Sequence, residues 1–355
     1  MLRRIAAVAV LGWLLGALAP GAARAQMELS LQRLRLEADG VNAPQDPWDG
    51  PCTPDLGGGR LRVACADETT WIHVANQFAA ALVPPVLLPA HTRGPRGIHV
   101  GLETFVTGID STQAYWRNAI EGSSVDSAIA WNRVNVRKGL GLGFELGTNI
   151  GFALNTSYWT LGLEIRWSLL EGLRLPGSSA YLPSLSVRGA VQTMVGDSEF
   201  NVTVPAVDVT LGERFVVGNA VEISPYVGGQ FSWVFVDSEL VDLTPAADAS
   251  ASCAAYTGPP GQPNGPPSPY GEAPYCQGDG SDYNNNAVFR SVRSMRARAF
   301  GGLQLRYEWF ALTTAFSIDV VQPSDLGGSG PSSSSYVPST VARQWQFQLG
   351  LGVSY

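Results

Sequence analysis

Three histidines are the residues of this sequence best suited to act as a general base, namely His73, His91 and His99. A hydrolase would also need a nucleophile or a metal arranged around that base. The sequence contains no G-x-S-x-G, no H-E-x-x-H and no phosphate-binding glycine loop in a suitable context. We therefore expect structural or solvated histidines, no catalytic residue, no bound metal and no cofactor.

Charged residues of both signs recur singly in segments where apolar and polar residues alternate. The candidates are Arg133, Glu145, Glu164, Arg166, Arg188, Glu222, Arg306 and Glu308. If these segments are strands, the alternation places all of the candidates on the face opposite the apolar side chains. Such a set could act as a selectivity ring in a pore, or as an ion-pair network filling a narrow interior. We favour the ion-pair network.

Four cysteines form two local pairs, Cys52 with Cys65 and Cys253 with Cys276. Four cysteines allow three connectivities, and we predict the two local disulfides. A zinc site is the alternative. Neither spacing is C-x-x-C, however, and His73 is the only histidine nearby, so zinc is disfavoured.

Strands must position these residues, because alternation continues along most of the chain after residue 97. The last segment shows it best, with apolar residues alternating with Gln, Gly and Ser. These apolar residues are Trp345, Phe347, Leu349, Leu351, Val353 and Tyr355. Strict period-two alternation predicts a strand with one apolar and one polar face. We expect this terminal strand to be the element used for assembly into a membrane.

Three features favour a membrane barrel over a soluble sandwich. The predicted strands have about 10–15 residues, whereas soluble strands have about 5–6. Trp and Tyr lie at strand ends, and charges lie on the polar face. An open sheet edge cannot be satisfied in hydrocarbon, so the sheet must close. We predict an all-β, transmembrane antiparallel up-and-down β-barrel of about ten strands, or twelve if residues 28–37 contribute a further pair.

The predicted barrel occupies residues 97–355. Its strands are 98–108, 124–136, 139–149, 157–168, 181–195, 199–211, 220–236, 289–307, 310–321 and 343–355. We expect a hairpin turn around Arg137, Lys138 and Gly139, and a bulge near Pro205, where the alternation changes phase. Short turns on one side and the long loops 237–288 and 322–342 on the other are typical of outer-membrane barrels.

Residues 1–25 have the parts of a secretory signal peptide: Arg3 and Arg4, then an apolar stretch, then the cleavage site Ala23-Arg24-Ala25. Residues 26–96 do not fit the barrel pattern and include a predicted short helix from Asp67 to Leu82. They form either a plug inside the lumen or an N-terminal periplasmic extension at the barrel mouth. We favour the extension.

Loop 237–288 carries seven acidic residues and no Lys or Arg. Its segment 278–286 is rich in oxygen-bearing side chains and could bind calcium, but it lacks EF-hand spacing, so a solvated loop is the simpler interpretation. The net charge of −7 and the single lysine argue against a nucleic-acid partner. The near-zero mean hydropathy of +0.05 fits strands with one lipid face and one polar face.

The terminal WQFQLGLGVSY resembles the last strand of bacterial outer-membrane β-barrel proteins. More narrowly, VRKGLGLGFELGTNIG (136–151), LGLEIRWSLLEG (161–172) and LPSLSVRGAV (182–191) resemble an uncharacterised barrel family from deltaproteobacteria. The resemblance covers most of 90–355. It implies an outer-membrane location and a barrel fold, and it brings no substrate and no functional residue.

The sequence therefore predicts a porin-like or structural surface protein without catalysis. The partners expected are outer-membrane lipid and the barrel-assembly machinery, with a small solute or surface ligand left open. A binding or adhesion protein acting through loops 237–288 and 322–342 is the alternative. An outer-membrane hydrolase is less favoured.

Overall fold

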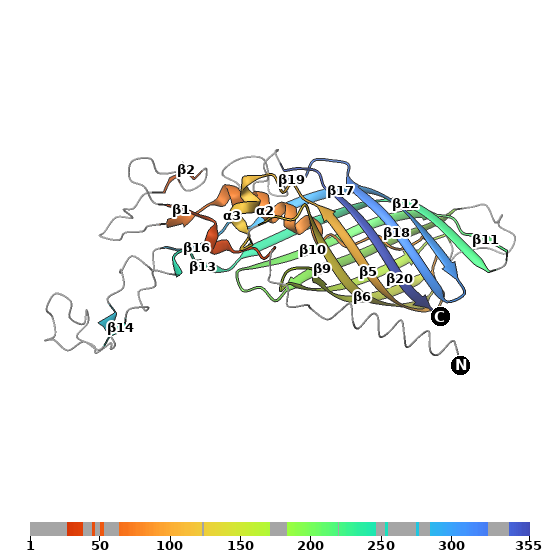
Figure 1. The fold of residues 1–355 in the computed structure, drawn as a ribbon. Coiled ribbons are helices and arrows are strands. Elements are labelled where there is room, and N and C mark those ends of the chain that lie inside the picture. Colours follow the sequence, from red (N-terminus) through yellow and green to blue (C-terminus); the bar gives the residue numbers. More distant parts are fainter. Residues whose placement is uncertain are drawn as a thin grey trace.

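The computed structural model describes residues 27–37, 45–46, 50–52, 64–122, 124–170, 183–218, 220–245, 253–254, 275–276, 285–325 and 341–355. Ten antiparallel strands form one closed barrel (Figure 1), because β12 also pairs with β17 and β20 with β5. The barrel strands are β5 (Ile98–Gly108), β6 (Ala128–Gly141), β7 (Phe144–Ala153), β8 (Trp159–Ser168), β9 (Ser184–Val195), β10 (Phe200–Gly212), β12 (Val221–Ser238), β17 (Val292–Tyr307), β18 (Phe310–Asp319) and β20 (Trp345–Ser354).

The two faces of the barrel differ as the alternation predicts. Outward positions carry apolar side chains that remain exposed, such as Leu163 at 59% and Leu351 at 55%. Inward positions are mostly buried in every barrel strand. The ten-stranded barrel is thus confirmed. The twelve-stranded alternative is wrong, because β1 (Arg35–Glu37) pairs outside the ring with β4 (Ala64–Ala66).

The hairpin between β6 and β7 turns later than predicted. Arg137 and Lys138 lie within β6, and the turn falls at Leu142 and Gly143. A tight turn needs left-handed backbone, and the φ angles there are +99° for Gly141, +52° for Leu142 and +81° for Gly143. Arg137 is buried on the inward face, where ion pairs hold it, so it is unavailable for a turn.

The bulge predicted near Pro205 is also absent, since β10 keeps one register with β9 on both sides of this residue. The change of phase has another cause. Val202 and Val204 point inward and are buried, although they are apolar, and further along Asp208 also points inward. The inward face is therefore apolar in one half of the strand and polar in the other.

Helix α2 (Glu68–Ala81) confirms the helix expected in the N-terminal region. Asp67 caps it, because its side chain accepts a hydrogen bond from the Thr70 amide at 3.0 Å. Pro84 and Pro85 follow its end and cannot continue it. No helix among the described residues is long and apolar enough to cross a membrane.

The remaining elements are short and lie around the ends of the barrel. They are η1 (Leu31–Arg33), β2 (Gln45–Asp46), β3 (Gly50–Pro51), α3 (Ala114–Ala119), β11 (Phe215–Val217), β13 (Leu240–Asp242), β14 (Cys253–Ala254), β15 (Tyr275–Cys276), β16 (Asn286–Val288) and β19 (Ser324–Asp325). Of the predicted loops 237–288 and 322–342, only parts are described, and residues 1–25 lie outside the described ranges.

The two ends of the barrel are distinct. The end that holds the C-terminus carries connections 142–143, 169–183, 213–220 and 308–309, and we call it the short-turn end. The other, long-loop end carries connections 109–127, 154–158, 196–199, 239–291 and 320–344, which are longer in total. Helices α2 and α3 lie at the long-loop end, opposite the C-terminus (Figure 1). We call residues 68–97 the lumen segment, because they run from the long-loop end along the barrel interior to β5.

Candidate functional site: the occupied lumen

A chain of alternating charges crosses the interior wall of the barrel. Its members, in order of contact, are Arg133, Glu103, Arg137, Glu164, Arg188 and Asp208. Arg137 is central, because it pairs with Glu103 at 2.9 Å and also with Glu164. Each of these side chains is buried. Buried ions are tolerated only when they are paired in this way, so the chain is an ion-pair network between strands β5, β6, β8, β9 and β10.

Three smaller clusters extend the charged interior. They are Arg166 and Arg93 on Glu145, Arg296 and Arg298 on Asp319, and His91 with Arg306 on Glu222. Asp319 is the most enclosed, at 0% side-chain exposure, and it lies 2.6 Å from Arg296 and 2.8 Å from Arg298. Two buried arginines share the Asp319 carboxylate, so both would lose their counter-charge if this carboxylate were removed.

Arginines of the wall also bind the main chain of the lumen segment. Arg296 donates to the Asn76 carbonyl at 2.8 Å, and Arg298 donates to the Ala80 carbonyl at 3.0 Å. Further along, Arg188 donates to the Pro85 carbonyl at 2.9 Å. Other wall contacts to main-chain atoms come from Gln230 to Pro84, Gln348 to Val86, Arg166 to Pro89 and His91, and Ser168 to Ala90. The barrel wall is therefore hydrogen-bonded to the main chain of the lumen segment along the length of the lumen.

Near the long-loop end an apolar core packs around helix α2, beside the cluster of Arg296, Arg298 and Asp319. Helix α2 contacts β5, β6, β10, β12 and β17 there. The rings of Phe78 and Tyr158 lie 5.5 Å apart, those of Phe78 and Phe200 5.8 Å, and those of Trp71 and Phe200 5.7 Å. Trp71 and Phe78 are 0% and 1% exposed, so they form a packed core that seals this end.

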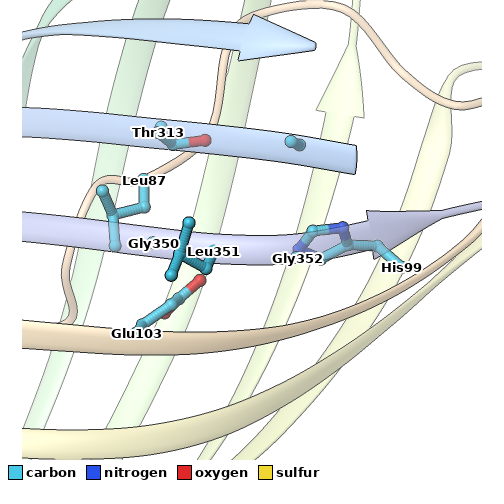
Figure 2. A pocket seen from close by; sticks show the side chains of 8 residues that line it. Leu87, His99, Glu103, Thr313, Gly350, Leu351 and Gly352 are labelled. Atoms are coloured by element: carbon cyan, nitrogen blue, oxygen red, sulfur yellow. The ribbon is translucent and has the colours of Figure 1, made fainter. Parts of the chain in front are cut away.

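A small pocket lies beside the lumen segment, near the short-turn end (Figure 2). Leu87, His99, Glu103 and Thr313 line it, together with the backbone around Gly350. It has room for about one water molecule, which is far too little for passage of a solute. His99 faces this pocket and lies 2.9 Å from the Ser354 hydroxyl through its Nδ1.

The three histidines are thus dispersed. His73 stacks on Tyr115 at 5.2 Å near the long-loop end, whereas His91 lies 3.1 Å from Glu222 and His99 is buried in β5. Among the described residues, no group of three or more His, Cys, Asp or Glu is placed to hold a metal ion. His99 does contact a hydroxyl, that of Ser354, but both residues are buried on the inner face of the barrel.

The structure places the predicted charged residues as follows. Buried on the lumen side are Arg133, Glu145, Glu164, Arg166 and Arg188. Glu222 and Arg306 lie 3.9 Å apart near the short-turn end and are only partly buried. Glu308 is corrected: it is exposed in the turn between β17 and β18, since its φ of +52° takes it out of the strand alternation.

Other charged residues of the lumen, in the network and in the smaller clusters, were not predicted from the sequence. They are Arg93, Glu103, Arg137, Asp208, Arg296, Arg298 and Asp319. The alternation does point to Glu103, Arg296 and Arg298, because each occupies an inward position of an alternating segment. Arg93 carries no such signal, because it belongs to the lumen segment and not to a strand.

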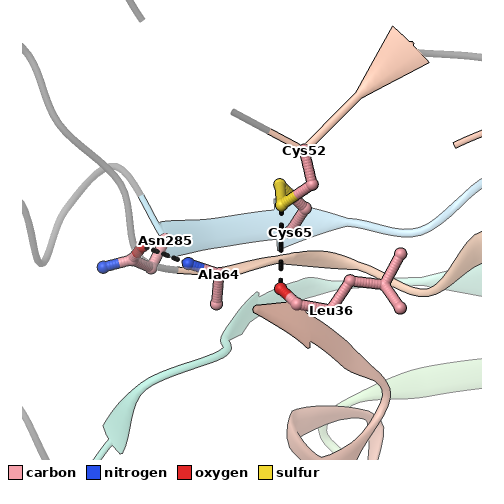
Figure 3. The surroundings of a disulfide bond; sticks show 5 residues. All are labelled: Leu36, Cys52, Ala64, Cys65 and Asn285. Atoms are coloured by element: carbon pink, nitrogen blue, oxygen red, sulfur yellow. Dashed lines mark hydrogen bonds between the residues drawn. A yellow bond between two sulfur atoms is a disulfide. The ribbon is translucent and has the colours of Figure 1, made fainter. Parts of the chain in front are cut away.

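Cys52 and Cys65 form the predicted disulfide, with their Cα atoms 5.9 Å apart (Figure 3). The bond lies beside the β1–β4 pair, where Leu36 is opposite Cys65. Cys253 and Cys276 are backbone partners in β14 and β15, and their bonding stays a prediction. Residues 278–284, the core of the possible calcium segment, lie outside the described residues.

Acidic residues meet the N-terminal region at the long-loop end. Glu199 accepts a hydrogen bond from the Leu31 amide at 2.5 Å. Burial raises the pKa of Glu199 and the pKa of Asp197 above the usual carboxyl range. A raised folded-state pKa contributes stability below the usual carboxyl pKa, and this stability is lost as pH rises through the raised value. The stability contributed by these two buried carboxyls therefore falls as pH rises, although the hydrogen bond from the Leu31 amide favours the ionised form of Glu199.

A closed barrel with an apolar exterior and a charged, occupied interior defines a transmembrane β-barrel. Neither a protein-family model nor a curated protein sequence matches this chain. Solved bacterial outer-membrane barrels match in structure. Ail, the attachment invasion locus protein of Yersinia pestis, has 8% identity and a TM-score of 0.25, over 73% of this chain and 99% of Ail. The N-terminal β-barrel domain of Pseudomonas aeruginosa OprF has 10% identity and a TM-score of 0.24, over 72% and 97%.

Proposed function

We propose that the protein is a non-catalytic outer-membrane β-barrel, porin-like in its shell and closed at rest by its own lumen segment. The observation that carries this proposal is the continuous bonding of wall residues to main-chain atoms from Asn76 to His91. The packed aromatic core around α2 supports it at the long-loop end. Asymmetric connections at the two ends support the outer membrane as the location.

The partners follow from the same geometry. Outward apolar side chains would contact outer-membrane lipid. The terminal strand β20, with Trp345 and Phe347 outward, would be recognised and bound by the barrel-assembly machinery. The motif resemblance to the deltaproteobacterial barrel family is consistent with this proposal and adds no substrate. No solute is assigned, because the lumen is filled.

Replacing Trp71 and Phe78 together by alanine should open the barrel. Each replacement of a buried aromatic side chain costs about 3–5 kcal/mol of packing energy. The lost contacts belong to α2, so most of the wall remains bonded. In planar bilayers we expect no stepwise current from the wild-type protein at low voltage, and stepwise current from the double variant.

Thr69→Ala is the matched control, because Thr69 is exposed on the same helix. Each protein must first show heat-modifiable mobility on gels, which reports a folded barrel. A wild-type protein with stable open channels would refute closure by the lumen segment. So would a folded double variant that is as silent as Thr69→Ala.

A further inference from the structure

The N-terminal region and the first barrel strand lie at opposite ends of the lumen. We call the described residues 27–37 and 64–66 the N-terminal cap. The cap is bonded to the long-loop end: Leu29 bridges to Ile120, the Ser30 amide donates to the Ala119 carbonyl at 2.8 Å, and the Ala64 amide donates to Asn285 at 3.2 Å. Figure 3 shows the last of these contacts beside the disulfide.

The lumen segment leaves the barrel at the other end. The Arg93 amide donates to Glu145 at 2.7 Å, and the Gly139 amide donates to the Gly97 carbonyl at 3.0 Å. The Ile98 amide then donates to the Tyr355 carbonyl at 2.9 Å, beside the C-terminus. A Cβ atom at Gly139 would lie 1.9 Å from the Gly94 carbonyl oxygen, so glycine permits this close passage.

The part of the lumen segment after α2, residues 83–94, is suited to run through a protein interior without helix or strand. A buried chain must satisfy its main-chain groups. Pro84, Pro85 and Pro89 have no amide hydrogen to satisfy, and wall residues donate to the carbonyl of each. These contacts are made to main-chain atoms and not to side chains. The lumen is therefore a binding site for an extended polypeptide, and this site is occupied by the protein's own lumen segment.

Outer-membrane barrels place short turns in the periplasm and long loops outside. With that orientation, the cap lies beyond the outer mouth while β5 begins at the periplasmic mouth. We infer that the N-terminal cap is displayed on the cell surface and is connected to the barrel through the barrel's own lumen. This inference rests on the proposed outer-membrane location. It places the N-terminal cap outside the cell, whereas the sequence favoured a periplasmic extension for residues 26–96.

Thiol labelling on intact cells tests the inference with the full chain. The probe is a polymer-linked maleimide too large to pass through outer-membrane pores. Arg33→Cys reports the cap, Ala114→Cys reports an outer connection, and Leu142→Cys reports the short-turn end, and all three positions are exposed. The wild-type protein gives the background from the native cysteines, and heat-modifiable mobility confirms that each variant is folded.

We expect Arg33→Cys to be labelled on intact cells to the same extent as Ala114→Cys, with Leu142→Cys labelled only after the outer membrane is permeabilised. Labelling of Ala114→Cys but not Arg33→Cys on intact cells would overturn surface display while leaving the barrel assignment intact. Labelling of Leu142→Cys alone would show the opposite orientation and overturn the inference. Protection of all three until permeabilisation would overturn the outer-membrane location itself.

Discussion

Replacing Arg137 by methionine is expected to lower the free energy of unfolding by about 3–5 kcal/mol, because it removes one partner from a buried ion-pair network. Arg137 is the link between Glu103 and Glu164, and all three side chains are buried. Methionine is also unbranched and apolar, so it keeps most of the volume and isolates the loss of charge. Chemical denaturation in detergent, followed by tryptophan fluorescence, measures the effect.

Arg214→Met is the matched control, because Arg214 is exposed in the connection after β10 and should change stability little. Arg137→Lys should fall between the two, because lysine keeps the charge but cannot bridge two carboxylates with a planar fork. Equal stability of the Arg137→Met and Arg214→Met proteins would show that the network does not stabilise the barrel.

Replacing Asp319 by asparagine should have a comparable effect, also about 3–5 kcal/mol, since Arg296 and Arg298 are left buried without a carboxylate. Asparagine has nearly the same shape, so packing is preserved. The same two arginines hold the carbonyls of Asn76 and Ala80 in α2. We therefore expect this variant to weaken the seal of the lumen as well as the barrel.

A double-mutant cycle distinguishes charge from shape in this cluster. Adding Arg298→Gln to Asp319→Asn removes one of the two unpaired cations, so it should recover part of the lost stability. Glu121→Gln, at an exposed position in the 109–127 connection, serves as the control for a simple change of net charge. A double variant that is destabilised by the full sum of the single effects would contradict the pairing.

The alternation of the sequence was sufficient to predict the barrel and some of its inward charges, because a strand has a fixed period of two. It also placed Arg137 wrongly. The pattern near Lys138 and Gly139 resembles a turn, and only the buried partners Glu103 and Glu164 reveal that β6 continues. Such partners come from other strands, and one segment read alone does not show them.

Occupation of the lumen was harder to foresee, since it depends on contacts between residues far apart in sequence. A signal was nevertheless present in the strands. Val202 and Val204 in β10 and Trp131 in β6 are apolar at inward positions. Apolar side chains on both faces at one end of a barrel strand imply that something apolar fills the lumen there. The phase change at Pro205 was evidence of the occupant, not of a bulge.

The most direct test of the occupied lumen is a thiol cross-link between Leu87 and Gly350. A Cβ atom at Gly350 would lie 3.4 Å from Leu87 Cδ1, and both residues line the same pocket. We predict that the Leu87→Cys/Gly350→Cys protein, shown to be folded by its heat-modifiable mobility, is cross-linked by a short bis-methanethiosulfonate, whose two ends each react with a thiol and release methanesulfinate. Leu87→Cys/Leu349→Cys is the control and should not cross-link, because Leu349 faces lipid at 40% exposure. A folded Leu87→Cys/Gly350→Cys barrel without a cross-link, in which the thiol introduced at position 87 reacts with a bulky maleimide, would contradict the account.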